Sequence, residues 1–202
     1  EEIFSLLREL REMGSVEVAI LGGEPLMHKD WFAICREVTN LGMNLQILTN
    51  GLLIGDEQVA QILELKPFCV GISFDGACPE TYQKMRGVDG FRHCKDLLFA
   101  LTDKGLENIS AITTLTKSNL HEFDQFVDLF KGTRVTWQTQ MVGNAGERFS
   151  NNESLSMEDY NWLIEKIADT LTKHRDLRCN TMYDLGYYPI DPRFRFLHQC
   201  WN

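Results

Sequence analysis

Apolar residues along this chain follow two different spacings, and each spacing predicts one kind of element. Apolar positions three to four residues apart are typical of helices, whereas short continuous apolar runs are typical of buried strands. Helical spacing is found at residues 1–13, 29–41, 56–65 and 90–104, in a segment capped by Asn119, and in one that begins at Ser156. Apolar runs lie between them at 16–21, 45–48, 68–74, 109–115 and 134–140. The sequence therefore predicts five strands that alternate with helices.

Polar side chains at the expected helix ends support these boundaries. Asp30 is a candidate N-cap for the second helix. Asn119 and Glu122 fit a capping box, in which the Glu122 side chain would bond back to the start of its own helix. Asp159 stands three residues after Ser156, at the start of the last predicted helix.

The alternation of strands and helices predicts parallel β/α units. Loops at the carboxyl ends of parallel strands hold ligands in barrels and in open sheets alike, so we expect the site at the five strand ends. Glycines and polar residues concentrate there, in the segments Gly22-Gly23-Glu24, Thr49-Asn50-Gly51, Ser73-Phe74-Asp75-Gly76, Thr114-Leu115-Thr116-Lys117 and Gln138-Thr139-Gln140.

Composition narrows the class of protein. The 202 residues are 44% hydrophobic, enough for a substantial core in one domain or a little more. A net charge of -9, without any basic run, argues against a nucleic-acid partner. No apolar stretch reaches the roughly 18 to 20 residues that span a bilayer, and no signal-peptide pattern opens the chain. We expect a cytoplasmic protein with no membrane partner.

The cysteines and the first residue add two further expectations. The six cysteines are too scattered for a disulfide framework and contain no C-x-x-C pair: Cys35, Cys69, Cys78, Cys94, Cys179 and Cys200. Free thiols are therefore expected. The chain opens inside a predicted helix without a methionine, which indicates a fragment of a longer protein.

The first strand end carries the most distinctive chemistry. Glycines at a strand terminus let backbone groups approach a ligand, and the carboxylate of Glu24 can accept hydrogen bonds from an ammonium group. The alternative is a tight turn with a solvated carboxylate. Polar companions at the other strand ends favour a ligand that carries an amino group.

Three of these strand ends resemble those of the radical S-adenosylmethionine superfamily: Gly22-Gly23-Glu24-Pro25-Leu26, Thr49-Asn50-Gly51 and Ser73-Phe74-Asp75-Gly76. Residues 80–87, with Gly90-Phe91 beyond them, are similar to the stretch after the third strand in members with a SPASM domain, which include peptide-modifying and sulfatase-maturing enzymes. The resemblance implies an α/β fold, a partial (β/α)6 TIM-like barrel of parallel strands that lacks its first strand.

The resemblance also implies the chemistry. In this superfamily a [4Fe-4S] cluster passes an electron to S-adenosylmethionine, and the resulting 5'-deoxyadenosyl radical abstracts hydrogen from a substrate. The implied partners are a peptide or protein substrate and an external electron donor. The cofactors of the parent protein would be S-adenosylmethionine and the cluster.

By the same resemblance, eight residues would contact S-adenosylmethionine: Gly22, Gly23, Glu24, Asn50, Ser73, Arg86, Gln138 and Gln140. The Gly-Gly-Glu segment would bind the methionyl amino group. Asn50 and Ser73 would face the methionyl or ribose portion, or alternatively cap turns. Arg86 would pair with the methionyl carboxylate, or alternatively form a structural ion pair. The two glutamines would contact adenine or substrate.

These 202 residues lack the cysteine motif that binds the radical cluster in this superfamily. The superfamily binds its radical cluster through a C-x3-C-x2-C loop after the barrel's first strand, and these 202 residues contain no such motif. The resemblance divides the chain into a barrel core at 1–155, a closing helix at 156–178, and the start of a SPASM bridge at 179–202, where Cys200 would bind an auxiliary cluster. We expect this chain to bind no cofactor and to be inactive by itself.

Two other functions stay open at this stage. The same scaffold could be a non-catalytic module that binds a nucleoside or a peptide. It could also be a hydrolase or isomerase that uses Glu24, Asp75 and a histidine, although no histidine falls at a strand end. Independently of function, an unpaired strand edge at 16–21 would favour self-association.

Overall fold

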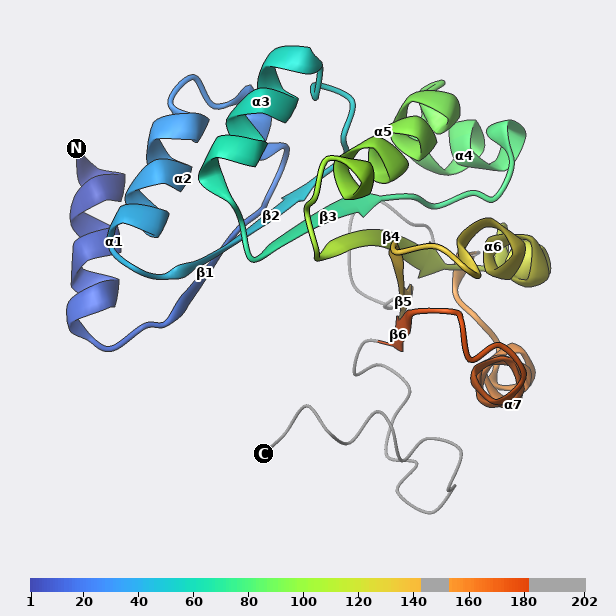
Figure 1. Ribbon diagram of the computed structural model, residues 1–202. Coiled ribbons are helices and arrows are strands. Elements are labelled where there is room, and N and C mark those ends of the chain that lie inside the picture. Colours follow the sequence, from blue (N-terminus) through green and yellow to red (C-terminus); the bar gives the residue numbers. More distant parts are fainter. Residues whose placement is uncertain (143–152, 182–202) are drawn as a thin grey trace. The chain divides into compact units, whose positions relative to one another are not determined.

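The structure is a computed structural model that describes residues 1–142 and 153–181. Six strands follow one another in chain order within the sheet, β1-β2-β3-β4-β5-β6 (Figure 1). The pairings of β1 with β2, β2 with β3, and β5 with β6 are parallel. The described residues fold into two compact units, the first of residues 1–73 and 92–110, the second of residues 74–91, 111–142 and 153–181.

The first unit contains three parallel strands and the helices that connect them. Its elements are α1 (Glu2–Glu12), β1 (Glu17–Ile20), η1 (Pro25–Met27), α2 (Trp31–Asn40), β2 (Asn44–Thr49), α3 (Asp56–Leu65), β3 (Cys69–Ser73) and, apart from its first residue, α5 (Phe91–Asp103). Helices α1, α2 and α3 lie on one side of the three strands (Figure 1). The core between them is aliphatic and includes Val38, Ile47, Ile62 and Ile72, each fully buried.

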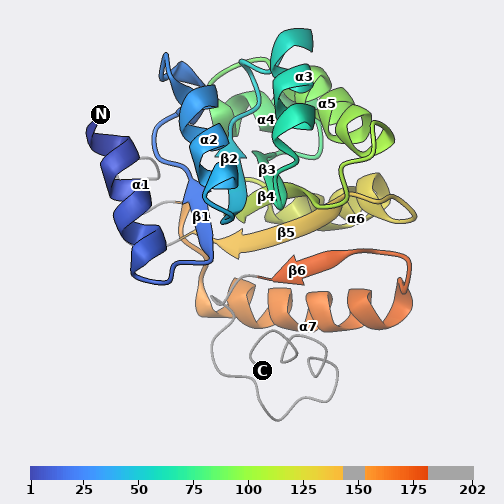
Figure 2. The same cartoon turned by 60° about the vertical axis from the view of Figure 1, so that its left-hand side comes forward.

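The second unit has an aromatic core. It contains α4 (Pro79–Arg86), most of β4 (Ile109–Leu115), η2 (Leu120–Glu122), α6 (Phe123–Phe130), β5 (Thr136–Met141), α7 (Met157–Lys173) and β6 (Cys179–Thr181). Trp137 of β5 stacks on Phe126 of α6, with ring centroids 5.4 Å apart. Phe74, just after β3, lies 5.6 Å from the Tyr82 ring of α4 and 5.9 Å from the Phe130 ring. Figure 2 shows β6 running alongside α7.

All five predicted strands are present, and the helical spacing correctly located α1, α2, α3, α5, α6 and α7. Besides the single-turn helix η1, two described elements were not predicted. One is α4, which buries only Tyr82 and Met85 and so shows little periodicity. The other is β6, a three-residue strand inside the segment interpreted as a SPASM bridge.

The polar residues noted at two predicted helix starts had different outcomes. Ser156 and Asp159 bond reciprocally at the start of α7 and form a capping box. The capping box of Asn119 and Glu122 is wrong. The Glu122 carboxylate instead accepts from Ala77 N–H at 2.8 Å and from the Thr81 hydroxyl, because it is buried against the loop after β3.

One sequence prediction concerns a part of the chain outside the described residues. Cys200 and most of the 179–202 segment, interpreted as a SPASM bridge, lie there. Over the described residues, every helix is too short or too polar to cross a membrane.

Candidate functional site

The loop after β1 presents an accessible backbone. Gly22 and Gly23 have φ angles of 94° and 50°, in the left-handed region that favours glycine. Both residues are exposed. No atom of the described residues 1–142 and 153–181 would lie within 4 Å of a Cβ at either position, so that part of the chain leaves space beside this backbone. A small ligand group can therefore approach the peptide groups directly.

Glu24 ties this loop to the end of β2. Its Oε1 atom accepts a hydrogen bond of 2.7 Å from the Thr49 hydroxyl and one of 3.2 Å from Leu26 N–H. Its Oε2 atom accepts a bond of 2.8 Å from Asn50 N–H. A carboxylate offers about four acceptor positions, so these three bonds leave room for one further donor, such as an ammonium group. We call this arrangement of Glu24, Thr49 and Asn50 the Glu24 clasp.

The turn at residues 49–51 is also stabilised by one of its own side chains. The Asn50 side chain caps it, because Oδ1 accepts from Leu52 N–H at 2.8 Å. Its amide nitrogen then remains as the donor end of the side chain. Gly51 has a φ of 79°, and a Cβ there would lie 2.9 Å from the Ile72 side chain. The turn therefore requires glycine both for its backbone conformation and for space.

Helix α5 supports the same turn from another direction. His93 Nε2 lies 3.1 Å from Gly51 O, and the Cys94 thiol donates to Asn50 O at 3.4 Å. The carbonyl groups of Asn50 and Gly51 thus have partners in α5. These contacts fix the backbone that presents the Asn50 side chain.

Ser73 is the last residue of β3 and is half-buried. Successive strand residues point to opposite faces, and Val70 and Ile72 occupy the fully buried face. Ser73 therefore points to the other face of the strand. In the first unit the structure brings Glu24 and Asn50 into direct contact, while Ser73 stands at the end of the next strand.

Arg86 forms a buried ion pair in the second unit. Its Nη1 lies 2.9 Å from Asp75 Oδ2, and the two side chains are only 10% and 3% exposed. The other Asp75 oxygen accepts from Thr114 N–H at 2.7 Å. The structural ion pair that the sequence left open is therefore present, and both oxygens of Asp75 have hydrogen-bond partners within the second unit.

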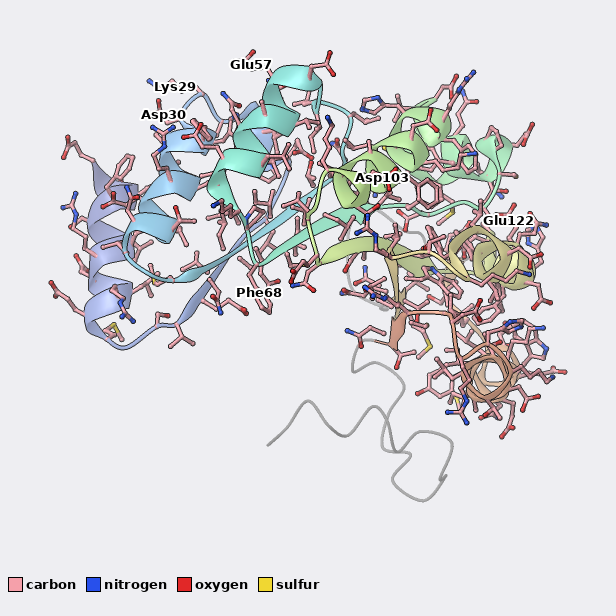
Figure 3. All side chains as sticks on the ribbon, in the orientation of Figure 1. Lys29, Asp30, Glu57, Phe68, Asp103 and Glu122 are labelled. Carbon is pink, nitrogen blue, oxygen red and sulfur yellow. The ribbon has the colours of Figure 1, made fainter. Side chains whose placement is uncertain are left out.

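The loop after β3 is fixed by two further buried side chains. Asn119 Nδ2 donates to the carbonyl oxygens of Asp75 and Thr114, both at 2.9 Å. Glu122, labelled at the start of α6 in Figure 3, holds the loop at Ala77. A Cβ on Gly76 would lie 2.1 Å from the backbone nitrogen of Tyr82, so α4 packs directly on this glycine.

Gln138 and Gln140 share the less buried face of β5. Both are half-buried and alternate with Trp137 and Thr139, which are buried. Gln140 Nε2 donates to the Thr114 hydroxyl at 2.8 Å. Thr114 therefore links Gln140 to Asp75 and through it to Arg86. Sequence reasoning noted Thr114 only as a strand-end residue and gave it no role.

The described residues do not supply a metal centre. They contain no group of three or more His, Cys, Asp or Glu side chains that could hold a metal ion. The five described cysteines are free, and burial raises the pKa of the Cys35 thiol to about 12, which disfavours the thiolate that a metal needs. The described part of the chain thus has a fixed carboxylate at Glu24 but no ligand set for an iron–sulfur cluster.

Comparison with protein families gives a match over most of the chain. Residues 1–130 match the Radical SAM superfamily. The AdoMet-dependent heme synthase of Oleidesulfovibrio alaskensis is 32% identical over 190 residues, which cover 91% of this chain and 48% of that protein. The mycofactocin maturase MftC of Mycobacterium ulcerans is 25% identical over 83% of this chain and 47% of its own length. The chain spans about half the length of these relatives.

A solved structure supports the fold. The crystal structure of Streptococcus suis SuiB bound to the precursor peptide SuiA matches with a TM-score of 0.77 at 20% identity, over 97% of this chain and 47% of SuiB. Together with the parallel pairings described above, this likeness confirms the predicted α/β fold of the partial-barrel type.

Proposed function

Because the chain belongs to the radical SAM superfamily, we propose that it is part of an iron–sulfur oxidoreductase and supplies the binding surface for S-adenosylmethionine. In this proposal the backbone of Gly22 and Gly23 and the carboxylate of Glu24 receive the methionyl amino group. The Glu24 clasp is the observation that carries the proposal, because it leaves one acceptor position of a fixed carboxylate beside an accessible backbone.

The remaining candidates contribute weaker contacts in the same proposal. Asn50 would donate from its amide nitrogen to the methionyl or ribose portion, since its oxygen is used within the turn. Ser73 would do so from the end of β3. Arg86 would use guanidinium N–H groups other than the one on Asp75 to pair with the methionyl carboxylate. Gln138 and Gln140 would contact adenine or substrate.

The protein would orient S-adenosylmethionine and keep water away from it, as in other cofactor enzymes. The electron that cleaves S-adenosylmethionine would come from a [4Fe-4S] cluster, for which the described residues offer no ligand set. An external donor would reduce that cluster. We further propose that these 202 residues alone bind no cluster and are inactive, and that Cys200 would serve an auxiliary cluster in a longer protein.

For the substrate we propose a peptide or protein. The supporting observations are the likeness to SuiB, whose structure holds a precursor peptide, and the similarity to a maturase. The proposed location is the cytoplasm. In this view residues 1–155 are the barrel core, 156–178 a closing helix and 179–202 the start of a SPASM bridge.

A non-catalytic binding module remains the second candidate, because no C-x3-C-x2-C motif occurs in these 202 residues. The complete reading frame that encodes the chain separates the two. We expect that motif about 15 to 20 residues before Glu1, the length of a loop and one helix. The anaerobically reconstituted product should then form 5'-deoxyadenosine from S-adenosylmethionine. A complete reading frame without the motif would favour the binding module. A reconstituted product that forms no 5'-deoxyadenosine would favour it as well.

Self-association along the edge of β1 also stays a proposal. β1 is the first strand of the sheet order, and its residues are exposed or half-buried. Val16 and Leu21 beside it are 69% and 61% exposed. Light scattering of the 202-residue chain should show a dimer, and a monodisperse monomer would contradict the proposal.

A further inference from the structure

The hydroxyl of Thr49 joins two parts of the candidate site. Its oxygen lies 2.7 Å from Glu24 Oε1 and 3.0 Å from the amide nitrogen of Gly51. Thr49 is only 4% exposed, at the end of β2. Bulk water therefore has little access to these bonds and cannot readily replace them.

The direction of both hydrogen bonds follows from their partners. The Gly51 amide can only donate, so the Thr49 oxygen accepts there. The single hydroxyl proton is then left for Glu24, whose ionised carboxylate can only accept. A hydrogen bond to an ionised acceptor is short and about twice as strong as a neutral one. The hydroxyl thus fixes a carboxylate and a turn at once.

Fixing the Glu24 carboxylate and the turn at Gly51 determines which polar atoms face a ligand. The Thr49 hydroxyl and Leu26 N–H both donate to Glu24 Oε1. The acceptor position that remains on Glu24 therefore belongs to Oε2, which also accepts from the backbone N–H of Asn50. The turn held by Gly51 also sets the direction of the Asn50 side chain. Without the hydroxyl, both groups would gain freedom that ligand binding would have to remove.

We propose that Thr49 is a positioning residue for S-adenosylmethionine, and that its hydroxyl orients the Glu24 carboxylate toward the ammonium group of the ligand. This inference rests on the proposed function. In this proposal Thr49 contacts Glu24 and Gly51 rather than the ligand itself. Loss of its hydroxyl should therefore weaken the binding of S-adenosylmethionine, which raises the dissociation constant.

Three variants test the proposal in the cluster-loaded product of the complete reading frame. Thr49→Val removes the hydroxyl and keeps the shape of the side chain, whereas Thr49→Ser keeps the hydroxyl. The matched control is Thr102→Val: Thr102 is 3% exposed in the same unit, and its hydroxyl donates to Phe99 O within α5. Calorimetry under anaerobic conditions gives the dissociation constant for S-adenosylmethionine.

We expect Thr49→Val to raise this constant roughly ten- to a hundred-fold, the effect of losing a hydrogen bond to a charged group. Thr49→Ser should stay within about threefold of wild type, and Thr102→Val should bind as wild type does. If Thr49→Val binds as tightly as Thr102→Val, the role of Thr49 is overturned while the proposed function stands. Equal losses in Thr49→Val and Thr49→Ser would overturn the role of the hydroxyl. If wild type does not bind S-adenosylmethionine, both proposals fall.

A second measurement does not depend on any variant folding. Amide hydrogen exchange of the wild-type 202-residue chain, followed by NMR, reports the Gly51 N–H directly. We expect it to exchange more slowly than the exposed Gly22 N–H, because its hydrogen bond must break first. Exchange of Gly51 as fast as that of Gly22 would show that the hydroxyl does not hold the turn.

Discussion

Arg86 and Asp75 form an ion pair of 2.9 Å that is almost entirely buried, and it joins the end of α4 to the loop after β3. Removing one partner leaves the other charge buried without compensation. Arg86→Met should therefore lower the free energy of unfolding by about 3 to 5 kcal/mol in urea denaturation.

The control for this prediction is Arg92→Met. Arg92 lies 3.8 Å from Asp96, and its side chain is 93% exposed, so its loss should cost less than about 1 kcal/mol. Equal costs for the two variants would mean that the Arg86 pair is solvated in solution.

Gly76 should not tolerate even one methyl group. A Cβ there would lie 2.1 Å from Tyr82 N and 2.5 Å from Tyr82 Cα, both backbone atoms that cannot move without displacing α4. Gly76→Ala should lower the free energy of unfolding by more than about 3 kcal/mol, beyond ordinary overpacking. In Gly55→Ala the new Cβ would meet only the flexible Gln58 Oε1 at 3.4 Å, and the cost should be at most about 1 kcal/mol. Thermal melts that rank Gly55→Ala as the more damaging change would refute this packing.

Glu122 should stabilise the loop after β3 through its charge. In Glu122→Gln, the amide end would face Ala77 N–H or the Thr81 hydroxyl, which both donate to the carboxylate now. We expect a loss of about 1 to 3 kcal/mol in the free energy of unfolding. Asp124→Asn, two residues further along in α6, removes an exposed pair with Lys166 and should cost less than about 1 kcal/mol. A neutral Glu122→Gln would show that the loop does not depend on this carboxylate.

The Cys35 thiol should make stability fall in alkaline solution. Burial raises its pKa from 9.0 to about 12. Below pH 9 the thiol is protonated in both the folded and unfolded states, and its contribution is fully present. Between pH 9 and 12 only the unfolded state loses the proton, so the folded state becomes less favourable. From pH 8 to 10.5, wild type should lose about 2 kcal/mol more than Cys35→Ala in urea denaturation. An equal loss in both proteins would contradict the burial of the Cys35 thiol.

The elements that sequence predicted well are those with long apolar patterns. Strand β2 and helix α2 bury one face over several residues, so their spacing is visible without knowledge of their neighbours. Helix α4 buries only two side chains, and β6 has three residues that become a strand only by pairing with β5. Such short elements depend on contacts distant in sequence, which a local pattern cannot reveal.

That strand-end residues such as Glu24 and Asn50 lie close together was predictable, but their hydrogen-bond partners were not. Parallel strands place their carboxyl ends at one edge, so Glu24 and Asn50 could be expected near each other. That Thr49 donates to Glu24 could not be read from the sequence, because a strand-end threonine is more often a local turn cap. For Glu122 the sequence predicted a contact that is not formed. Its spacing matched a capping box, but its buried carboxylate accepts a hydrogen bond from Ala77 N–H instead.

In the proposed function, the loop of Gly22, Gly23 and Glu24 receives S-adenosylmethionine. The dissociation constant for S-adenosylmethionine, measured for the cluster-loaded product of the complete reading frame and for two of its variants, tests it most directly. Glu24→Gln should weaken binding roughly ten- to a hundred-fold, through loss of charge-assisted hydrogen bonds. Glu17→Gln, an exposed change in β1 of the same unit, should leave binding unchanged. Equal affinity of the Glu24→Gln and Glu17→Gln variants would contradict the claim.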